Sequence, residues 1–439
     1  MAFYFAGAVV ARTGDEMAGP ALMLAGYAVA GSASTAAALL AGITAAAAAG
    51  GPVLGAVLDR QQRPGRLLAA ALALYAAGLV AILVGLGRLP LMVTVVIAVL
   101  TGSLGPALSG GWTGQLPRVA ADGRLPRANA LDAMTFGMAS LAGPSLAGGL
   151  AETLGASTAV VVAAALIGSA APAAWRLPGR PVPLREAERG PLIGDLAAGL
   201  RVVVGRRRLA RATLVSVVCC ATQGMLTACV PLLGAHVLGG AGRGALLLSC
   251  TAVSALAANA VLARSARSVT PDSIIRAGAL IQAAALALAA TDRPAGLVLA
   301  LLLIGIGEGP QLTALFAIRH REAPDRLRGQ IFTTGASLKI TGFAAGAALA
   351  GPLATWSLPG ALATASGVTA AAALAFHAVP LDAPGAPSPA SCSAGPERCR
   401  SSKGAKNASP RPGTDAAEQA RNAGNPPWPG QMTDDTCKP

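Results

Sequence analysis

Three ionisable residues stand close together in the first apolar segment of the chain: Arg12, Asp15 and Glu16. On a helix, positions three and four apart share a face, so the arginine can partly neutralise the two carboxylates. One negative charge then remains, which suits a proton or another cation. A purely structural cluster within one helix is the alternative, as is an arginine that extends to the aqueous surface.

A second candidate pair lies in the last third of the chain. Glu308 stands near the middle of one long apolar segment, and Lys339 stands about ten residues into the next. If these segments are neighbours, the pair forms either a silent buried ion pair or a switch linked to protons or substrate. Buried Glu and Lys change their pKa values readily, as a coupling site requires. Four polar residues either line a cavity or join helices by hydrogen bonds: Gln223, Asn259, Gln282 and Gln311.

Signatures of enzymes are missing from the sequence. No glycine-rich loop ends in Gly-Lys-Ser or Gly-Lys-Thr, so we expect no ATPase site. His236, His320 and His377 are too far apart in the chain to form a metal site, and the seven cysteines lack metal-binding or disulfide spacing. We therefore expect no catalytic residues, no metal and no cofactor.

Long apolar runs alternate with short connections, and arginine clusters occupy every second connection. The chain is 54% hydrophobic and 12% charged, with a net charge of +14. Positive charge beside a spanning helix stays in the cytoplasm, and the few aromatic residues argue against nucleic-acid binding. At about 20 residues per span, we expect an all-α, polytopic inner-membrane protein with about twelve helices and both termini cytoplasmic. The expected spans are 3–30, 36–58, 67–87, 90–113, 128–151, 156–175, 210–235, 244–263, 273–291, 295–317, 329–354 and 359–379.

These spans divide into two groups of six. We expect an N-terminal six-helix bundle over 1–175, a cytosolic linker over 176–208 and a C-terminal six-helix bundle over 209–380. The proline-containing linker is expected to hold an amphipathic helix near 192–204. The tail, 381–439, is rich in Pro, Ser, Gly and Asn, so we expect it to be disordered in the cytosol.

Two spans in corresponding halves carry a Gly-Pro step, Gly143-Pro144 in one and Gly351-Pro352 in the other. Such a step breaks or bends a helix where neighbouring helices can satisfy the freed carbonyl. A matched pair favours a central pathway in a repeat-built transporter, although alanine- and glycine-rich helices also produce such matches by chance. Asp132, near the start of the first of these spans, is expected to pack at the cytosolic interface.

The connection between the second and third spans carries the most specific motif, Gly55-Ala-Val-Leu-Asp59-Arg60-Gln-Gln-Arg63-Pro-Gly-Arg66. This spacing resembles the signature loop of the major facilitator superfamily, in which a Gly is followed by Asp-Arg and further basic residues. Gly55 is expected to allow close helix packing, and Asp59 to accept hydrogen bonds from a helix end or to pair with an arginine. Such contacts close the cytoplasmic side in one state and break in the other. The usual Gly after Asp-Arg-x is here Gln62.

Other segments are similar to bacterial efflux members of that family, including exporters of drugs, siderophores and macrolides. They are Gly14-Asp15, Leu116-Pro117-Arg118, Asn129-Ala130-Leu131 and Gly143-Pro144. Over residues 3–380 the resemblance implies alternating access and proton-coupled efflux by a two-bundle, monomeric transporter. The expected partners are then a small-molecule substrate, protons and the lipid bilayer. An uptake permease, a transporter-like sensor or assembly protein and a membrane-embedded enzyme remain as alternatives.

Overall fold

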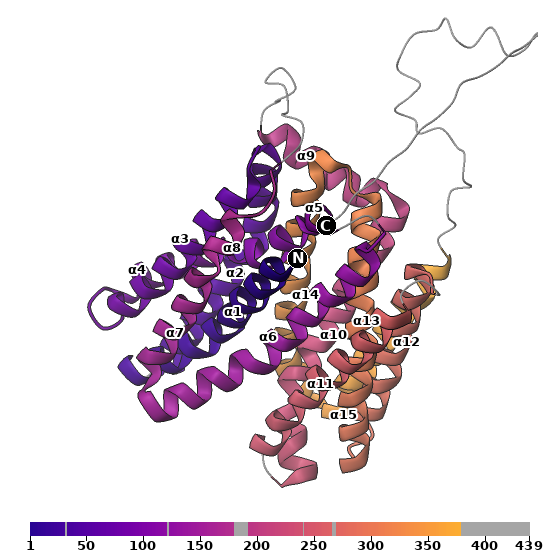
Figure 1. Cartoon of the computed structure of the whole chain (residues 1–439). Coiled ribbons are helices and arrows are strands. Elements are labelled where there is room, and N and C mark those ends of the chain that lie inside the picture. The colour runs from indigo at the N-terminus through magenta and orange to yellow at the C-terminus, as the bar shows by residue number, and fades with distance from the viewer. Residues whose placement is uncertain (31–32, 121–122, 180–191, 240, 266–268, 379–439) are drawn as a thin grey trace, which may run out of the picture. The chain divides into compact units, whose positions relative to one another are not determined.

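The computed structural model describes residues 1–30, 33–120, 123–179, 192–239, 241–265 and 269–378, which form helices joined by short loops (Figure 1). The first helices are α1 (Ala2–Ala30), α2 (Ala33–Arg60), α3 (Pro64–Gly85), α4 (Leu91–Gly102), the π-helix η1 (Ala107–Gly111), α5 (Leu116–Val119), α6 (Leu125–Leu154), α7 (Ala156–Ser169) and α8 (Ala171–Trp175). The later ones are α9 (Leu192–Gly205), α10 (Arg207–Leu238), α11 (Ala241–Ser265), α12 (Pro271–Ala289), α13 (Pro294–Glu322), the 3-10 helix η3 (Asp325–Leu327), α14 (Arg328–Trp356) and α15 (Leu358–Ala378). The predicted tail, 381–439, lies outside the described residues.

The boundaries of several helices follow from local chemistry. Pro64, Pro271 and Pro294 occupy first-turn positions, where the missing amide hydrogen is not needed. Thr270 caps α12, because its hydroxyl accepts a hydrogen bond from the amide of Ser273. Gly239 ends α10 with a left-handed φ of 71°, a conformation that favours glycine.

Nine stretches of the described residues are long and apolar enough to cross a bilayer. They lie at nine of the expected spans. The other three expected spans form α1, α6 and α14, of 29, 30 and 29 residues. These helices are long enough to cross the hydrocarbon core, but charged and polar side chains interrupt them. The prediction of an all-α, polytopic membrane protein is confirmed.

The described residues, up to 378, form one compact unit. One cluster of buried apolar side chains draws on residues 4–177, and two others draw on residues 203–376. The predicted bundle boundaries near 175 and 209 stay predictions. Large apolar side chains are also exposed on the helices, as a lipid-facing surface requires: Leu74, Val84, Val96, Leu100, Leu280, Leu299, Val368 and Leu374.

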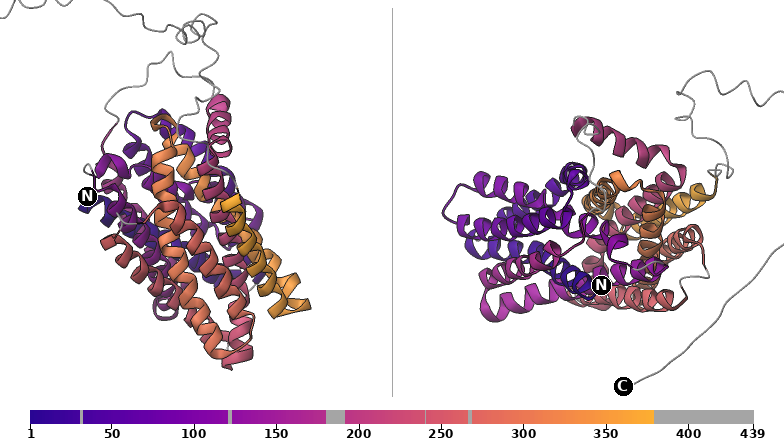
Figure 2. Two further views of the ribbon diagram at one scale, coloured as in Figure 1. Left: turned by 90° about the vertical axis from the view of Figure 1, so that its right-hand side faces the viewer. Right: turned by 45° about the horizontal axis from the view of Figure 1, so that its top comes forward.

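Helix pairs join the first part of the chain to the second. The helix α14 packs against both α2 and α10, and α6 packs against α11 and α13 (Figures 1 and 2). The helix expected near 192–204 is α9, which touches α2, α10 and α14. The expected span 90–113 is not one regular helix, because α4 is followed by the π-helix η1. Short π-helical segments often occur at functional sites, and η1 contributes to the site described next.

Candidate functional site

Asp59, at the end of α2, binds the beginning of α14. One carboxylate oxygen accepts a hydrogen bond of 2.9 Å from the amide of Gly329, and the other accepts one of 2.8 Å from the amide of Gln330. The Asp59 side chain is buried. The first amides of a helix have no partner within the helix and carry partial positive charge, so a carboxylate there is stabilising.

Gly55, one turn before Asp59, lets α2 approach α14 closely. A Cβ atom at this position would lie 2.1 Å from Thr333 Oγ1 and 2.4 Å from the Cα of Gln330. The side chain of Gln330 in turn donates a 3.1 Å hydrogen bond to the carbonyl of Leu196 on α9. A glycine is therefore required for this packing.

The arginines of the same motif take different positions. Arg60 forms a 2.7 Å ion pair with Asp195 on α9. The exposed Arg66 stacks over the ring of Trp175, 5.0 Å from its centroid, and Arg63 is exposed just before α3. The structure thus brings Gly55, Asp59 and Arg60 to the contact with α14 and α9, but not Arg63 and Arg66.

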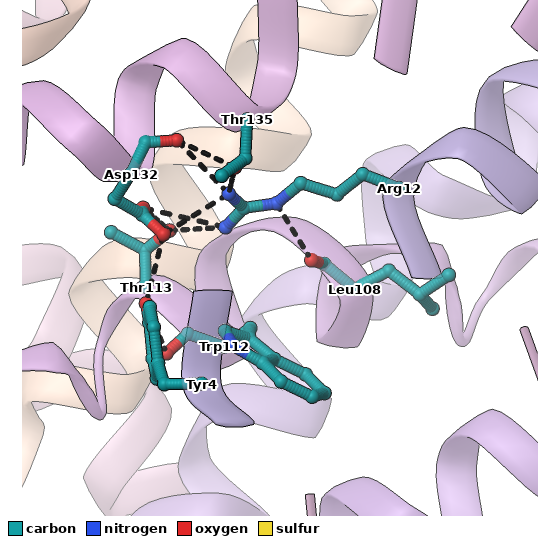
Figure 3. Close-up of polar contacts among 7 residues, drawn as sticks. All are labelled: Tyr4, Arg12, Leu108, Trp112, Thr113, Asp132 and Thr135. Atoms are coloured by element: carbon teal, nitrogen blue, oxygen red, sulfur yellow. Dashed lines mark hydrogen bonds and ion pairs between the residues drawn. The ribbon is translucent and has the colours of Figure 1, made fainter. Parts of the chain in front are cut away.

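The spacing predicted that Arg12 pairs with the carboxylates of its own helix. Instead, Arg12 forms an ion pair with Asp132 on α6 (Figure 3). Its Nη1 atom lies 3.1 Å from both Oδ1 and the carbonyl oxygen of Asp132. Asp132 also accepts hydrogen bonds from Tyr4 (2.9 Å) and Thr113 (2.7 Å). These two hydrogen bonds hold the Asp132 carboxylate in position for its ion pair with Arg12.

The remaining hydrogen bonds of the Arg12 guanidinium extend the network to η1 and α6. Nε donates to the carbonyl of Leu108 at 3.4 Å, Nη2 donates to Thr113 at 2.9 Å, and Nη1 donates to Thr135. The Cζ atom of Arg12 also lies over the ring of Phe136, 3.7 Å from its centroid. The Asp132 side chain is completely buried within this network, and its expected place near the cytosolic interface stays a prediction.

Asp15 and Glu16 turn to different helices. The Asp15 carboxylate accepts a 2.8 Å hydrogen bond from the hydroxyl of Tyr75 on α3. The Glu16 carboxylate accepts one of 3.3 Å from Ser140 on α6 and interacts electrostatically with Glu308. The first apolar segment therefore presents two carboxylates whose charges Arg12 does not neutralise by direct contact.

Glu308 and Lys339 are near one another but do not form the predicted direct pair. Lys339 acts electrostatically on Glu308, yet the salt bridges of 4.0 Å or less among the described residues do not include this pair. The Glu308 carboxylate instead accepts a 2.7 Å hydrogen bond from Gln223 on α10, and Lys339 interacts with Cys220. Glu308 thus has Gln223 as its hydrogen-bond partner, and Lys339 has Cys220, in place of the expected direct ion pair.

Two adjoining cavities contain these charged groups, and both are lined by Phe136 and Leu312. The first, here the charged cavity, has a volume of about 190 Å³, and its lining includes Arg12, Asp15, Glu16, Phe316, Arg319, Phe332 and Lys339. The second, the Glu308 cavity, has a volume of about 220 Å³, and its lining includes Ser140, Gln223, Thr227, Thr251 and Glu308. Helices from both parts of the chain form the walls, and carboxylates lie in each cavity.

The Gly-Pro steps do not break their helices, because α6 continues through Pro144 and α14 through Pro352. Gly143 touches α1, since a Cβ atom there would lie 2.6 Å from the Cβ of Glu16. Gly351 has no such neighbour within 4 Å. The close contact of α14 with α10 lies instead at Gly346, whose Cβ would fall 1.7 Å from the carbonyl oxygen of Ala221. The packing thus matches Gly143 with Gly346, not with Gly351.

Sequence reasoning missed three residues of this region: Tyr4, Tyr75 and Arg319. Each lies in an apolar run without a motif, and the partners of the tyrosines are 128 and 60 positions away. A signal was present only for Arg319, a charged residue near the end of a long apolar segment.

Comparison with known proteins agrees with this architecture. Residues 4–338 match the family model described as Major Facilitator Superfamily. The sequence is 29% identical over 294 residues to an uncharacterised MFS-type transporter, y4rN, of Sinorhizobium fredii, covering 65% of this chain and 71% of that protein.

Solved structures share the fold at low sequence identity. The human organic anion transporter MFSD10 matches with a TM-score of 0.69 and 15% identity over 85% of this chain and 98% of its own. A bacterial homologue of the iron transporter ferroportin in an outward-facing state has a TM-score of 0.67 and 16% identity, over 86% of this chain and 99% of its own. FucP in the outward conformation has a TM-score of 0.66 and 16% identity, over 86% and 97%. With these matches and the Asp59 contact in place, the chain belongs to the major facilitator superfamily of membrane transporters.

Proposed function

We propose that this protein exports a small molecule across the cytoplasmic membrane by alternating access, driven by the inward movement of protons. The observation that carries the proposal is the juxtaposition of Glu16 and Glu308 at two adjoining cavities between the halves of the chain. Carboxylates that line a cavity within the membrane are costly unless they bind a cation or a proton.

The contacts of Asp59 supply the second requirement, a gate that opens and closes. The gate residues Gly55, Asp59 and Arg60 join α2 to α14 and α9 through hydrogen bonds, close packing and an ion pair. Because hydrogen bonds and an ion pair between separate helices form this contact, it can be released without unfolding either helix. This arrangement supports a state in which one side of the cavity is closed.

Orientation follows from the arginine distribution. The gate motif lies in an arginine-rich connection, so we place the gate and both termini in the cytoplasm. The direction of transport rests on the sequence resemblance to bacterial efflux proteins, and we propose a monomer as the functional unit.

The proposal is tested in two steps. A deletion strain is first screened for altered drug susceptibility and for retained metabolites, which identifies a substrate. The purified full-length protein is then placed in proteoliposomes with an imposed pH gradient, and both substrate flux and internal pH are followed. Coupled movement of protons and substrate in opposite directions is expected.

A matched control comes from Glu152, an exposed carboxylate on α6 outside both cavities. Glu152→Gln should retain coupled flux. Substrate accumulation that is insensitive to the pH gradient in the wild-type protein would refute proton coupling, and the absence of any flux would favour a sensor or assembly role.

A further inference from the structure

Arg319, on α13, is a buried cation that the gate and the carboxylates leave without a hydrogen-bond partner. Its side chain is 2% exposed, and neither Nε nor Nη2 has a partner among the described residues. The residue lines the charged cavity. A buried guanidinium with unsatisfied N–H groups is energetically costly, so the site is incomplete without an anion.

The other charged groups of the cavity already have partners. Arg12 is saturated by Asp132 and its neighbours, and Lys339 interacts with Cys220. The two carboxylates accept hydrogen bonds from Tyr75 and Ser140. The described salt bridges include none to Arg319. Among the described residues, Arg319 is therefore the charged group of this cavity that has no hydrogen-bond or ion-pair partner and is available to bind a ligand.

The aromatic side chains around Arg319 also indicate the chemical character of the rest of the ligand. Phe332 lies beside the guanidinium, with its ring centroid 5.8 Å from Cζ, and packs on Phe316 at 6.0 Å between centroids. Phe316 continues to Phe136 at 5.9 Å. These three rings line the same cavity of about 190 Å³. An apolar or aromatic body of modest size fits against them.

Gly335 on α14 leaves room for the guanidinium itself. A Cβ atom there would lie 2.2 Å from Nη2 of Arg319. The backbone of α14 thus approaches the arginine directly, and the planar group is held beside the cavity rather than extended to solvent.

We propose that Arg319 binds the carboxylate of a small amphipathic organic anion whose apolar body rests on Phe136, Phe316 and Phe332. The proposal rests on the proposed function, because it takes the charged cavity to be the substrate site. A guanidinium presents two parallel N–H donors that match a carboxylate, which an ammonium group cannot do.

Binding is measured on the purified full-length protein in detergent with three probes of nearly equal shape: sodium benzoate, benzamide and benzylamine hydrochloride. A thiol-reactive fluorescent dye follows thermal unfolding through the buried cysteines Cys219, Cys220 and Cys229. A ligand of the native state raises the unfolding temperature in a saturable way. Benzoate is expected to do so, and the neutral and cationic probes are not.

Arg319→Gln should weaken the apparent affinity for benzoate by about tenfold or more, since a charge-assisted pair is lost. Arg319→Lys keeps the charge but loses the two parallel N–H donors, and should give an intermediate affinity for benzoate. Arg321→Gln is the matched control on the same helix. Its side chain is 46% exposed and pairs outside the cavity, so the affinity should change by less than about twofold.

Three outcomes would overturn the proposal: equal stabilisation by benzoate and benzamide, equal stabilisation by sodium chloride at the same ionic strength, or full benzoate affinity in Arg319→Gln. The comparison of the three probes on the wild-type protein tests the proposal even if Arg319→Gln does not fold. Binding in detergent needs no gradient. A failure here therefore leaves proton-driven transport standing, whereas a failure of coupled flux leaves the anion site standing.

Discussion

The guanidinium of Arg12 lies 3.1 Å from Oδ1 of Asp132, a residue 120 positions later in the chain, and both side chains are buried. This pair joins α1 to α6, while Thr113 and the carbonyl of Leu108 tie it to the segment at η1. Arg12 also lines the charged cavity. The cavity wall is therefore held in place by an ion pair that is itself removed from solvent.

The first prediction concerns this pair. Asp132→Asn leaves the buried Arg12 without its counter-charge and should destabilise the protein by about 3–5 kcal/mol. Thermal unfolding in detergent measures the effect, with the exposed Glu152→Gln on the same helix as control. Simultaneous replacement by apolar residues, Arg12→Met with Asp132→Leu, should be milder than Asp132→Asn alone. An unchanged unfolding temperature in Asp132→Asn would show that the pair contributes no stability.

The second prediction compares two glycines of α14. Gly346→Ala places a methyl group where the carbonyl oxygen of Ala221 lies, so α14 must move away from α10 at a cost of about 1–3 kcal/mol. Gly351→Ala meets nothing within 4 Å and should be neutral or slightly stabilising, because alanine favours the helix. The two unfolding temperatures should therefore shift in opposite directions or by clearly different amounts. Equal effects would contradict the packing described for Gly346.

The third prediction concerns the gate. Asp59→Asn removes the charge that binds the first amides of α14, which should weaken the contact by about 1 kcal/mol. Hydrogen exchange at Gly329 and Gln330 should then be about fivefold faster, and transport slower, because the balance between the two states has changed.

Glu152→Gln provides the control for loss of a carboxylate, since Glu152 is exposed on α6 and is not part of the gate. Its exchange rates at Gly329 and Gln330 should match those of the wild type. If both variants accelerate exchange equally, the contact with Asp59 is not what protects these amides.

The fourth prediction concerns proton coupling. Glu308→Gln keeps the hydrogen-bonding shape beside Gln223 but cannot take up a proton. Transport should lose its dependence on the pH gradient while downhill exchange of substrate continues. Glu16→Gln, at the adjoining cavity, tests whether the second carboxylate shares this role. If gradient-driven transport survives when Glu308→Gln and Glu16→Gln are combined, neither carboxylate carries the proton.

The sequence alone was enough for the family and for most of the helices. Apolar runs of about 20 residues permit little besides membrane helices, and the spacing of Gly55, Asp59 and Arg60 is a local pattern at the end of one helix. The amphipathic helix α9 was likewise expected, since its periodicity is local.

Only the tertiary structure decided which charges meet. Arg12, Asp15 and Glu16 suggested a cluster within one helix. Instead, Arg12 and Glu16 turn to two different residues of α6, Asp132 and Ser140, and Asp15 turns to Tyr75 on α3. The match between Gly143 and Gly346 also required the contacts with α1 and α10. A helix packs against neighbours through more than one face, and the sequence does not say which neighbour lies on which face. The unpartnered Arg319 became evident for the same reason, because a missing contact can be recognised only after the surrounding helices have been placed.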